Sequence, residues 1–230
     1  MLSYNKSMIN DFRFPFKGLE TIERNFSQAY QDLFVLSVLD GKRNGTFLEI
    51  GASTPIDISN TYLLEKYFGW NGISIDLIPN EKEMFEWAGR IAKVIVGDAV
   101  SLDYNVILAG FDSNVLDYIS LDIEPNIQTL NCLKNLPLDN FDFRVISYET
   151  DHYDPANTKE HNDMVRRESR DILQSHGYIL VNGNVANMGN DEFEDWYINS
   201  KYFDKSTIDK FIRKDDGILM ARHYMLRNAE

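Results

Sequence analysis

Short apolar runs alternate with amphipathic stretches through the middle of this chain. Glycine, asparagine or acidic residues bound the runs, a pattern typical of buried strands. The predicted strands are Thr46–Ile50, Gly72–Ile75, Ala92–Val96, Tyr118–Leu121 and Phe143–Ser147. Between them, the spacing of apolar residues predicts helices over Asn60–Phe68, Glu81–Ala88, Ile127–Leu133 and Asp163–Ser175. This alternation favours an α/β fold whose mainly parallel sheet is covered by helices on both faces.

The flanking segments complete the expected architecture. Ser27 is expected to cap a first helix that runs from Gln28 to Leu39. Two later apolar runs, Tyr178–Val181 and Trp196–Ile198, are expected to pair as antiparallel strands. We interpret residues 1–230 as one domain, in which 1–26 form an N-terminal extension across the surface and 203–230 a helical C-terminal tail.

An acidic residue stands where each of the five predicted strands passes into a loop. These residues are Glu49, Asp76, Asp98, Asp122 and Glu149. The carboxyl ends of parallel strands converge on one crevice, where ligands bind. Acids are frequent in loops of any protein, and this chain has 36 of them among 230 residues. Five in matching positions nevertheless favour a pocket for a cationic ligand, a polyol, a metal ion or a proton that must be removed.

The turn after the first strand narrows the choice of cofactor. The segment Gly51-Ala52-Ser53-Thr54-Pro55 contains a single glycine, whereas a dinucleotide site needs Gly-x-Gly-x-x-Gly to approach a pyrophosphate. A cofactor that carries a ribose and no phosphate tolerates such a turn. S-adenosylmethionine is such a cofactor, and its positive charges suit acidic surroundings. The residues therefore favour a methyltransferase over a dehydrogenase.

Composition and charge argue against several other classes of protein. The net charge of −13, from 23 basic and 36 acidic residues, opposes binding to a nucleic-acid backbone. No apolar run reaches the ~20 residues of a membrane span, and the N-terminus lacks an apolar signal core, so we expect a cytoplasmic protein. Cys132 is the only cysteine, which excludes an intrachain disulfide and a multi-cysteine zinc site, and we expect it to be buried and inert.

Several motifs, in order along the chain, resemble the FkbM-type family of S-adenosylmethionine-dependent methyltransferases. They are Ser27-Gln28 with Gln31-Asp32, Glu49-Ile50-Gly51-Ala52, Ser59-Asn60-Thr61, Leu64-Glu65, Gly69-Trp70, Asp117 to Glu124, Glu149 with Tyr153, Arg166 with Ser169-Arg170, Gly177-Tyr178 and Glu194-Asp195-Trp196. The resemblance extends from about Ser27 to Trp196. Thr54-Pro55-Ile56 departs from the family pattern, and so does Thr150, where a histidine commonly stands.

The resemblance implies a Rossmann-like class I methyltransferase fold, with a seven-stranded sheet whose last strand is inserted antiparallel. By position, it implies a cofactor site in which Gly51 and Ala52 contact the methionine half and Glu49 lies beside it. Asp76 would bind the ribose, and Asp98 with Ala99 would border the adenine. Ser53 and Asn60 complete the predicted cofactor site.

The same resemblance implies methyl transfer to a hydroxyl of a small molecule or glycan, with a sugar as the favoured acceptor. Asp122 is the leading candidate for the base, with Glu124, Glu149 and His152 as further catalytic candidates. Asp122 and Glu124 have ordinary alternatives, as a helix cap and as an acid favoured by the helix dipole. Asp122, Glu124 and Glu149 also offer hard oxygen ligands, so dependence on Mg²⁺ or Ca²⁺ stays open.

A second class of protein competes with the methyltransferase. In that alternative the chain keeps the fold but is a non-catalytic carbohydrate-binding or scaffold protein.

Arg166 and Arg170 lie four residues apart on one predicted helix. They either clamp an anionic substrate or form surface pairs with Glu168 or Asp171.

Overall fold

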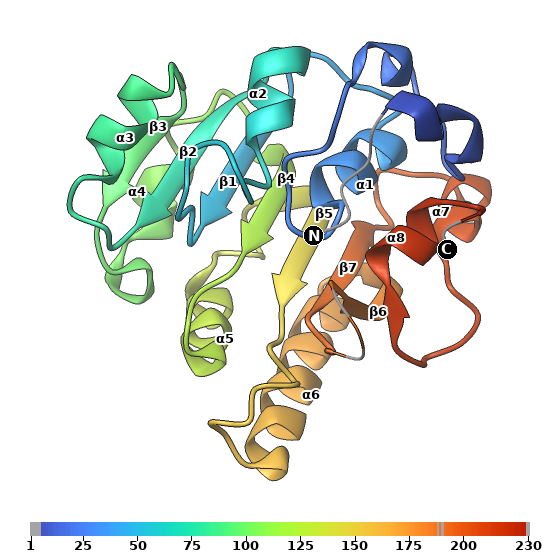
Figure 1. Ribbon diagram of the computed structural model, residues 1–230. Helices are drawn as coiled ribbons and strands as arrows, with labels where there is room; N and C mark the ends of the chain where they lie inside the picture. The colour runs from blue at the N-terminus through green and yellow to red at the C-terminus, as the bar shows by residue number, and fades with distance from the viewer. Residues whose placement is uncertain (1–5, 188, 190, 229–230) are drawn as a thin grey trace.

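A computed structural model of the chain describes residues 6–187, 189 and 191–228. Figure 1 shows a twisted sheet with helices in front of it and behind it. The strands are β1 Thr46–Ile50, β2 Asn71–Asp76, β3 Lys93–Val96, β4 Val115–Leu121, β5 Asp142–Glu149, β6 Tyr178–Ala186, β7 Glu194–Asn199 and β8 Leu219–Met220. The helices are α1 Gln31–Val38, α2 Tyr62–Phe68, α3 Glu81–Trp87, α4 Tyr104–Leu108, α5 Asn126–Asn135, α6 Lys159–Ser175, α7 Lys205–Phe211 and α8 Ala221–Met225. Three short 3₁₀ helices are η1 Lys6–Asp11, η2 Leu19–Thr21 and η3 Ala99–Ser101.

The sheet has the strand order β3-β2-β1-β4-β5-β7-β6-β8. Strands β1 to β5 are parallel to one another, and β7 lies antiparallel between β5 and β6. The expected α/β class and the inserted antiparallel strand are therefore confirmed. The strand count is not, because the described chain has eight strands instead of seven. The additional strand β8 adds two residues beside β6, too short a run to give a sequence pattern.

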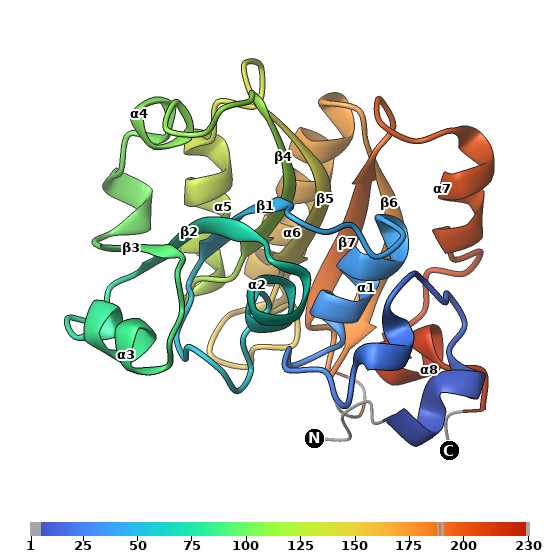
Figure 2. The same cartoon turned by 90° about the horizontal axis from the view of Figure 1, so that it is seen from above.

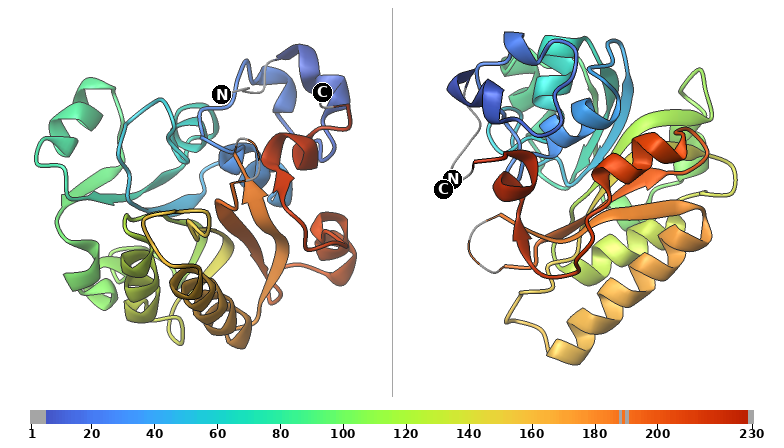
Figure 3. Two further views of the ribbon diagram at one scale, coloured as in Figure 1. Left: turned by 60° about the horizontal axis from the view of Figure 1, so that its bottom comes forward. Right: turned by 90° about the vertical axis from the view of Figure 1, so that its right-hand side faces the viewer.

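Alternate side chains along each central strand enter different hydrophobic clusters, because successive residues of a strand point to opposite faces. In β1, Phe47 belongs to the cluster under α1 and α2, whereas Leu48 belongs to the one under α4, α5 and α6. Tyr118 and Ile119 of β4 divide in the same way. Figure 2 and the right panel of Figure 3 show the two helical layers on either side of the sheet. A doubly covered sheet explains why its strands read as nearly continuous apolar runs.

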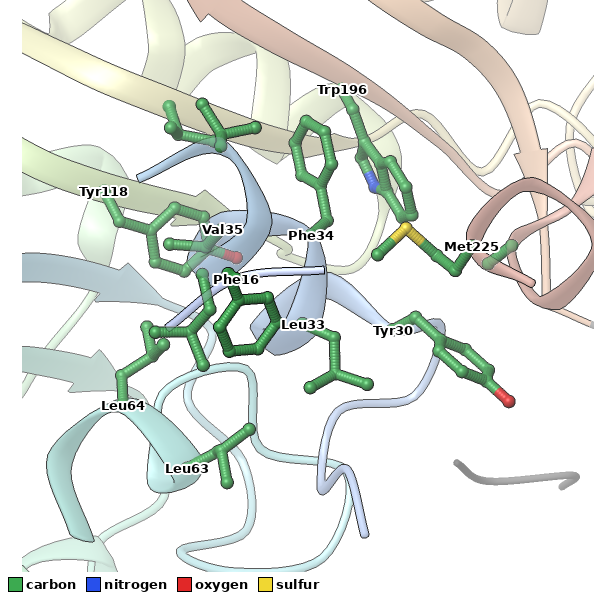
Figure 4. Close-up of a cluster of buried hydrophobic side chains, with 14 of the residues drawn as sticks. Phe16, Tyr30, Leu33, Phe34, Val35, Leu63, Leu64, Tyr118, Trp196 and Met225 are labelled. Carbon is green, nitrogen blue, oxygen red and sulfur yellow. The ribbon is translucent and has the colours of Figure 1, made fainter. Parts of the chain in front are cut away.

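The N-terminal extension and the C-terminal tail together cover one face of the sheet. Phe12 forms an isolated antiparallel bridge with Leu226, and the backbone N–H of Arg13 donates to Met225 O over 2.8 Å. Phe16 is buried in the same cluster. In Figure 4, Phe16 and Met225 lie beside the buried residues of α1 and Trp196 of β7. The extension was expected to cross the surface, but Phe12, Phe16 and Phe26 are core residues, and the tail that lies against it includes the short helices α7 and α8.

The first helix begins three residues later than expected. Tyr30 is its N-cap residue instead of Ser27, but Ser27 Oγ accepts from the backbone N–H of Asp32 in the first turn of α1 over 3.3 Å. In return, the Asp32 carboxylate accepts from the backbone N–H groups of Phe26 and Ser27 over 2.7 and 3.2 Å. Burial raises the pKa of the Asp32 carboxyl, and these hydrogen bonds counteract the rise. The motif around Ser27 and Asp32 is therefore an anchored loop before the helix.

Cys132 is fully buried in α5, as expected. Its Sγ lies 3.1 Å from the hydroxyl of Tyr104, and burial raises the pKa of the thiol to about 11. Because the thiolate is the reactive form, the thiol is unreactive at neutral pH.

Candidate functional site

The turn after β1 is held against the end of β4. Gly51 has φ +82°, and a Cβ at this position would collide with the carbonyl oxygen of Asp122. Only glycine fits both the left-handed conformation and the close approach. The N–H groups of Gly51 and Ala52 donate to Ile75 O over 2.9 and 3.2 Å, and the N–H of Asp122 donates to Ile50 O over 3.0 Å. The backbone thus fixes the ends of β1, β2 and β4 relative to one another.

Asp76 closes the next strand end and orients the same turn. Its Oδ2 accepts from the N–H of Ser53 over 2.7 Å, and its Oδ1 accepts from the N–H of Ile78 over 3.0 Å. Each carboxylate oxygen keeps a second lone pair for a ligand. Two hydroxyls of a ribose at this position would therefore meet two oriented acceptors.

Glu49 is buried at the end of β1 and is supported by a charged network beneath the site. Its Oε2 accepts from Thr61 Oγ1 and Ser74 Oγ, each over 2.8 Å. Arg90, whose side chain has no exposed area, donates to Thr61 Oγ1 over 2.7 Å and to Glu65 Oε2 over 2.8 Å. Burial raises the pKa of Glu49, and the positive charge of Arg90 counteracts the rise.

A cavity of about 700 Å³ opens at these strand ends, within the usual range for a small-molecule site. All eight predicted cofactor residues line it, as do the predicted catalytic residues Asp122, Glu124 and Glu149. The eight are Glu49, Gly51, Ala52, Ser53, Asn60, Asp76, Asp98 and Ala99. Six of the lining side chains are Asp or Glu. No Lys, Arg or His in the described part of the chain lines the cavity. The cavity is therefore suited to a ligand that carries positive charge.

Crowding of acids changes the protonation of Asp122. Burial raises its pKa to about 8, and the neighbouring carboxylates of Asp151 and Glu124 add to the rise. Near Asp76, burial and the carboxylates of Asp76 and Glu49 raise the pKa of Glu81 to about 8 as well. Both groups hold a proton at neutral pH, and a cation nearby would lower both pKa values.

Two buried acceptor atoms in the cavity wall lack a partner among the described residues. They are Asn60 Oδ1 and Glu149 Oε2. The amide nitrogen of Asn60 is already used, since it donates to Ser120 Oγ over 2.8 Å. A buried polar atom without a hydrogen bond costs free energy. A ligand with hydrogen-bond donors would remove that cost.

His152 does not join the other candidates. Its Nε2 lies 2.7 Å from Asp163 Oδ1, and its Nδ1 contacts Glu192 Oε2. It is not among the residues that line the cavity. The loop after β5 turns the imidazole toward α6, where acidic partners hold both of its nitrogens.

The two arginines of α6 are paired within the protein. Arg170 makes two hydrogen bonds to the buried Asp195, over 2.7 and 2.8 Å, and Arg166 lies 3.1 Å from Glu192. Neither lines the cavity at the strand ends. The predicted anion clamp is therefore wrong for this cavity, and the partners are residues of β7 and of the segment before it instead of Glu168 or Asp171.

The acids of the cavity do not form a metal site by themselves. Within residues 6–187, 189 and 191–228, no group of three or more His, Cys, Asp or Glu side chains is arranged to hold a metal ion. In the same part of the chain, no helix has the length and apolar character of a membrane-spanning segment.

Sequence reasoning missed several residues of the site. Gln28, Tyr153 and Phe193 line the cavity, and the Arg90–Glu65 pair supports it. Gln28, Tyr153 and Glu65 belong to the motifs that resemble the FkbM-type family, and this resemblance could have identified them as site residues. Arg90 and Phe193 have no local pattern that distinguishes them.

The strand order, with one antiparallel strand between β5 and β6, is that of the class I methyltransferase fold. No protein-family model matches the sequence, and no curated protein matches it at a significant level. Membership of the FkbM-type family therefore stays a prediction.

Solved structures with a similar chain path include three from different organisms. Fibrillarin of Methanococcus jannaschii, a pre-rRNA processing protein, is 19% identical over 68% of this chain and 67% of its own, with a TM-score of 0.48. The cofactor-bound Rv0187 from MTB is 18% identical over 75% and 78%, with a TM-score of 0.49. A SAM-dependent methyltransferase from Aquifex aeolicus is 14% identical over 84% and 97%, with a TM-score of 0.46. Identities and TM-scores this low do not transfer the activity of any of these proteins to this chain.

Proposed function

We propose that this chain is an S-adenosylmethionine-dependent methyltransferase that methylates a hydroxyl of a small molecule or glycan. The observation that carries the proposal is one cavity at the carboxyl ends of five parallel strands, where the described residues contribute six acidic side chains and no basic one. Both the sulfonium and the ammonium of the cofactor are cationic, so this wall complements them.

The residues present fit the cofactor in three respects. Gly51 lines the cavity without a side chain, so its backbone could approach the cofactor closely. Asp76 offers two oriented acceptors for a ribose. Asn60 Oδ1 is a buried acceptor without a partner in the described chain. Asn60 and Glu49 would accept hydrogen bonds from the ammonium of the methionine half. Asp98 and Ala99 would border the adenine.

When bound, S-adenosylmethionine supplies an electrophilic methyl group. The protein would align the acceptor hydroxyl with that methyl and remove its proton. Asp122 is the candidate base because it lines the cavity at the end of β4 and its pKa of about 8 is close to neutral pH. The positive charge of the ligands favours the carboxylate form of Asp122, which is the form that accepts a proton.

Calorimetry with S-adenosylmethionine tests the proposal. We expect the wild type to bind and Asp76→Ala to bind at least tenfold more weakly. Lack of binding by the wild type, or undiminished binding by Asp76→Ala, would contradict the cofactor assignment and favour a non-catalytic protein with this fold. Turnover that is unchanged in chelator would separately remove a divalent metal from the mechanism.

A further inference from the structure

The cavity has two ends along the sheet edge. Gly51, Asp76 and Asp98 lie at the end formed by β1, β2 and β3. Strand β5 is the second neighbour of β1, and adjacent strands lie ~4.8 Å apart, so Glu149 at the end of β5 is about 10 Å across the sheet from Gly51. We call the part of the cavity at β4 and β5 the acceptor end. It comprises Glu124, Gln128, Glu149, Tyr153 and Phe193.

Among the described residues of the cavity wall, no basic side chain balances the acids of the acceptor end. The basic side chains that follow β5 are engaged elsewhere: His152 and Arg166 both contact Asp163 and Glu192. An anionic acceptor would therefore meet the acids Glu124 and Glu149 with no cation from the described residues of the wall to offset them. A neutral acceptor would not offset the repulsion among the acids of the acceptor end.

One of these carboxylates lacks a hydrogen-bond donor. Glu149 is 8% exposed and lines the cavity, and its Oε2 has no partner among the described residues. Next to it, burial and the carboxylates of Glu124 and Asp154 raise the pKa of Asp151 to about 6. A hydrogen-bond donor would satisfy this buried oxygen, and a donor with a positive charge would in addition offset the repulsion among the neighbouring acids.

Two aromatic residues accompany the acids. Tyr153, whose exposed fraction is 45%, and the buried Phe193 both line this end. Aromatic rings attract ammonium groups through their electron-rich faces, and the attraction adds to that of a carboxylate. Carboxylates and aromatic rings together are the surroundings that recognise an organic cation.

We propose that the acceptor carries a protonated amine, which Glu149 holds at the acceptor end beside Tyr153 and Phe193. This inference rests on the proposed function and narrows its acceptor from any hydroxyl compound to a hydroxylated amine, of which an amino sugar is the simplest sugar form. The amine serves as the anchor, and the hydroxyl faces Asp122.

Equilibrium binding tests the inference without turnover. The protein is saturated with S-adenosylhomocysteine, which has no methyl group to transfer, and is titrated with the methyl glycosides of glucosamine, glucose and glucuronic acid by ligand-observed NMR. These probes share a ring and differ in charge. We expect the cationic glycoside to bind at least tenfold more tightly than the neutral one, and the anionic one not to bind.

Variants assign the preference to one residue. Glu149→Gln keeps the size of the side chain and removes its charge, so we expect it to abolish the preference for the cationic glycoside while the affinity for S-adenosylhomocysteine stays unchanged. Glu160→Gln, an exposed acid on α6, loses the same charge away from the cavity and should keep the preference.

The contrary outcomes are equally clear. Equal affinity for the three glycosides, tighter binding of the anionic one, or an intact preference in Glu149→Gln overturns the inference. So does a protein that binds S-adenosylhomocysteine but not the cationic glycoside. If S-adenosylhomocysteine itself does not bind, the proposed function fails, and the acceptor assignment fails with it.

Discussion

Arg90 offers a sharp test of how the site is supported. Its side chain is fully buried and donates to Glu65 Oε2, Pro55 O and Thr61 Oγ1 over 2.7 to 2.8 Å. Its guanidinium also lies 4.6 Å from the centroid of the Phe85 ring. The substitution Arg90→Met keeps a long apolar stem and removes the charge and every donor.

The expected loss of stability in Arg90→Met comes from the Glu65 carboxylate, which stays buried after its charged partner is removed. Glu65 is 1% exposed, and in Arg90→Met its carboxylate would keep only the N–H groups of Ile91 and Ala92 as donors. Removing one partner of a buried ion pair costs about 3–5 kcal/mol, a large part of the ~5–15 kcal/mol that stabilises most proteins. At an m-value of about 2–3 kcal/mol/M, the urea midpoint would fall by roughly 1–2.5 M.

Urea unfolding followed by circular dichroism measures the effect. The matched control is Arg24→Met, because Arg24 also pairs with an acid, Asp57 at 3.1 Å, but both side chains are exposed, and such pairs contribute about 0–1 kcal/mol. Adding Glu65→Leu to Arg90→Met should recover part of the loss, since the buried Glu65 carboxylate that lost its partner is then absent. If Arg90→Met were as stable as Arg24→Met, the network would not support the site.

Three further predictions concern Gly51, Glu194 and Asp122. Gly51→Ala should weaken binding of S-adenosylhomocysteine at least tenfold and cost more stability than Gly89→Ala, a left-handed glycine where an added Cβ would meet only the flexible Lys66 Nζ, at 3.5 Å, and where ~1–2 kcal/mol is expected; equal effects would contradict the close contact with Asp122. Burial raises the pKa of Glu194 from 4.5 to about 8, so the folded state binds more protons than the unfolded state between these values, and stability falls as pH rises. Glu194→Gln should therefore gain stability relative to wild type from pH 5 to pH 8 in urea unfolding, and parallel curves would refute this. Because the pKa of Asp122 is raised to about 8, affinity for S-adenosylmethionine should rise with pH below pH 8 and level off above it, whereas Asp122→Asn should show a shallower calorimetric profile, in which Glu81 still titrates near pH 8; equal slopes in wild type and Asp122→Asn would exclude the linkage to Asp122.

The strand ends of the site could be predicted from the sequence because the topology of a parallel sheet brings them together. Glu49, Asp76, Asp98 and Asp122 are far apart in sequence, but each follows an apolar run, and parallel strands must align their carboxyl ends. The register confirms this, since Glu49 pairs with both Ser74 and Ser120. Periodicity was therefore sufficient for this part of the site.

Contacts made by single side chains could not be predicted in this way. Arg90 and Glu65 look like ordinary surface charges in the sequence, and only the packing of α2 against the loop before β3 buries them together. His152 looked like a base because it follows β5, but its rotamer and the position of Glu192 direct it to α6. The burial of Phe12 also depends on a partner more than 200 residues away, Leu226.

Methyl transfer is an in-line displacement, so an enzyme gains most from holding donor and acceptor in a fixed relation. In this chain the backbone makes that connection. Gly51 touches the carbonyl of Asp122, and the N–H of Asp122 donates to Ile50 O, so the turn that would hold the donor and the residue that would receive the proton cannot move independently. Under the proposed function, a side chain at Gly51 would therefore impair catalysis as well as binding, because it would displace the candidate base together with the turn.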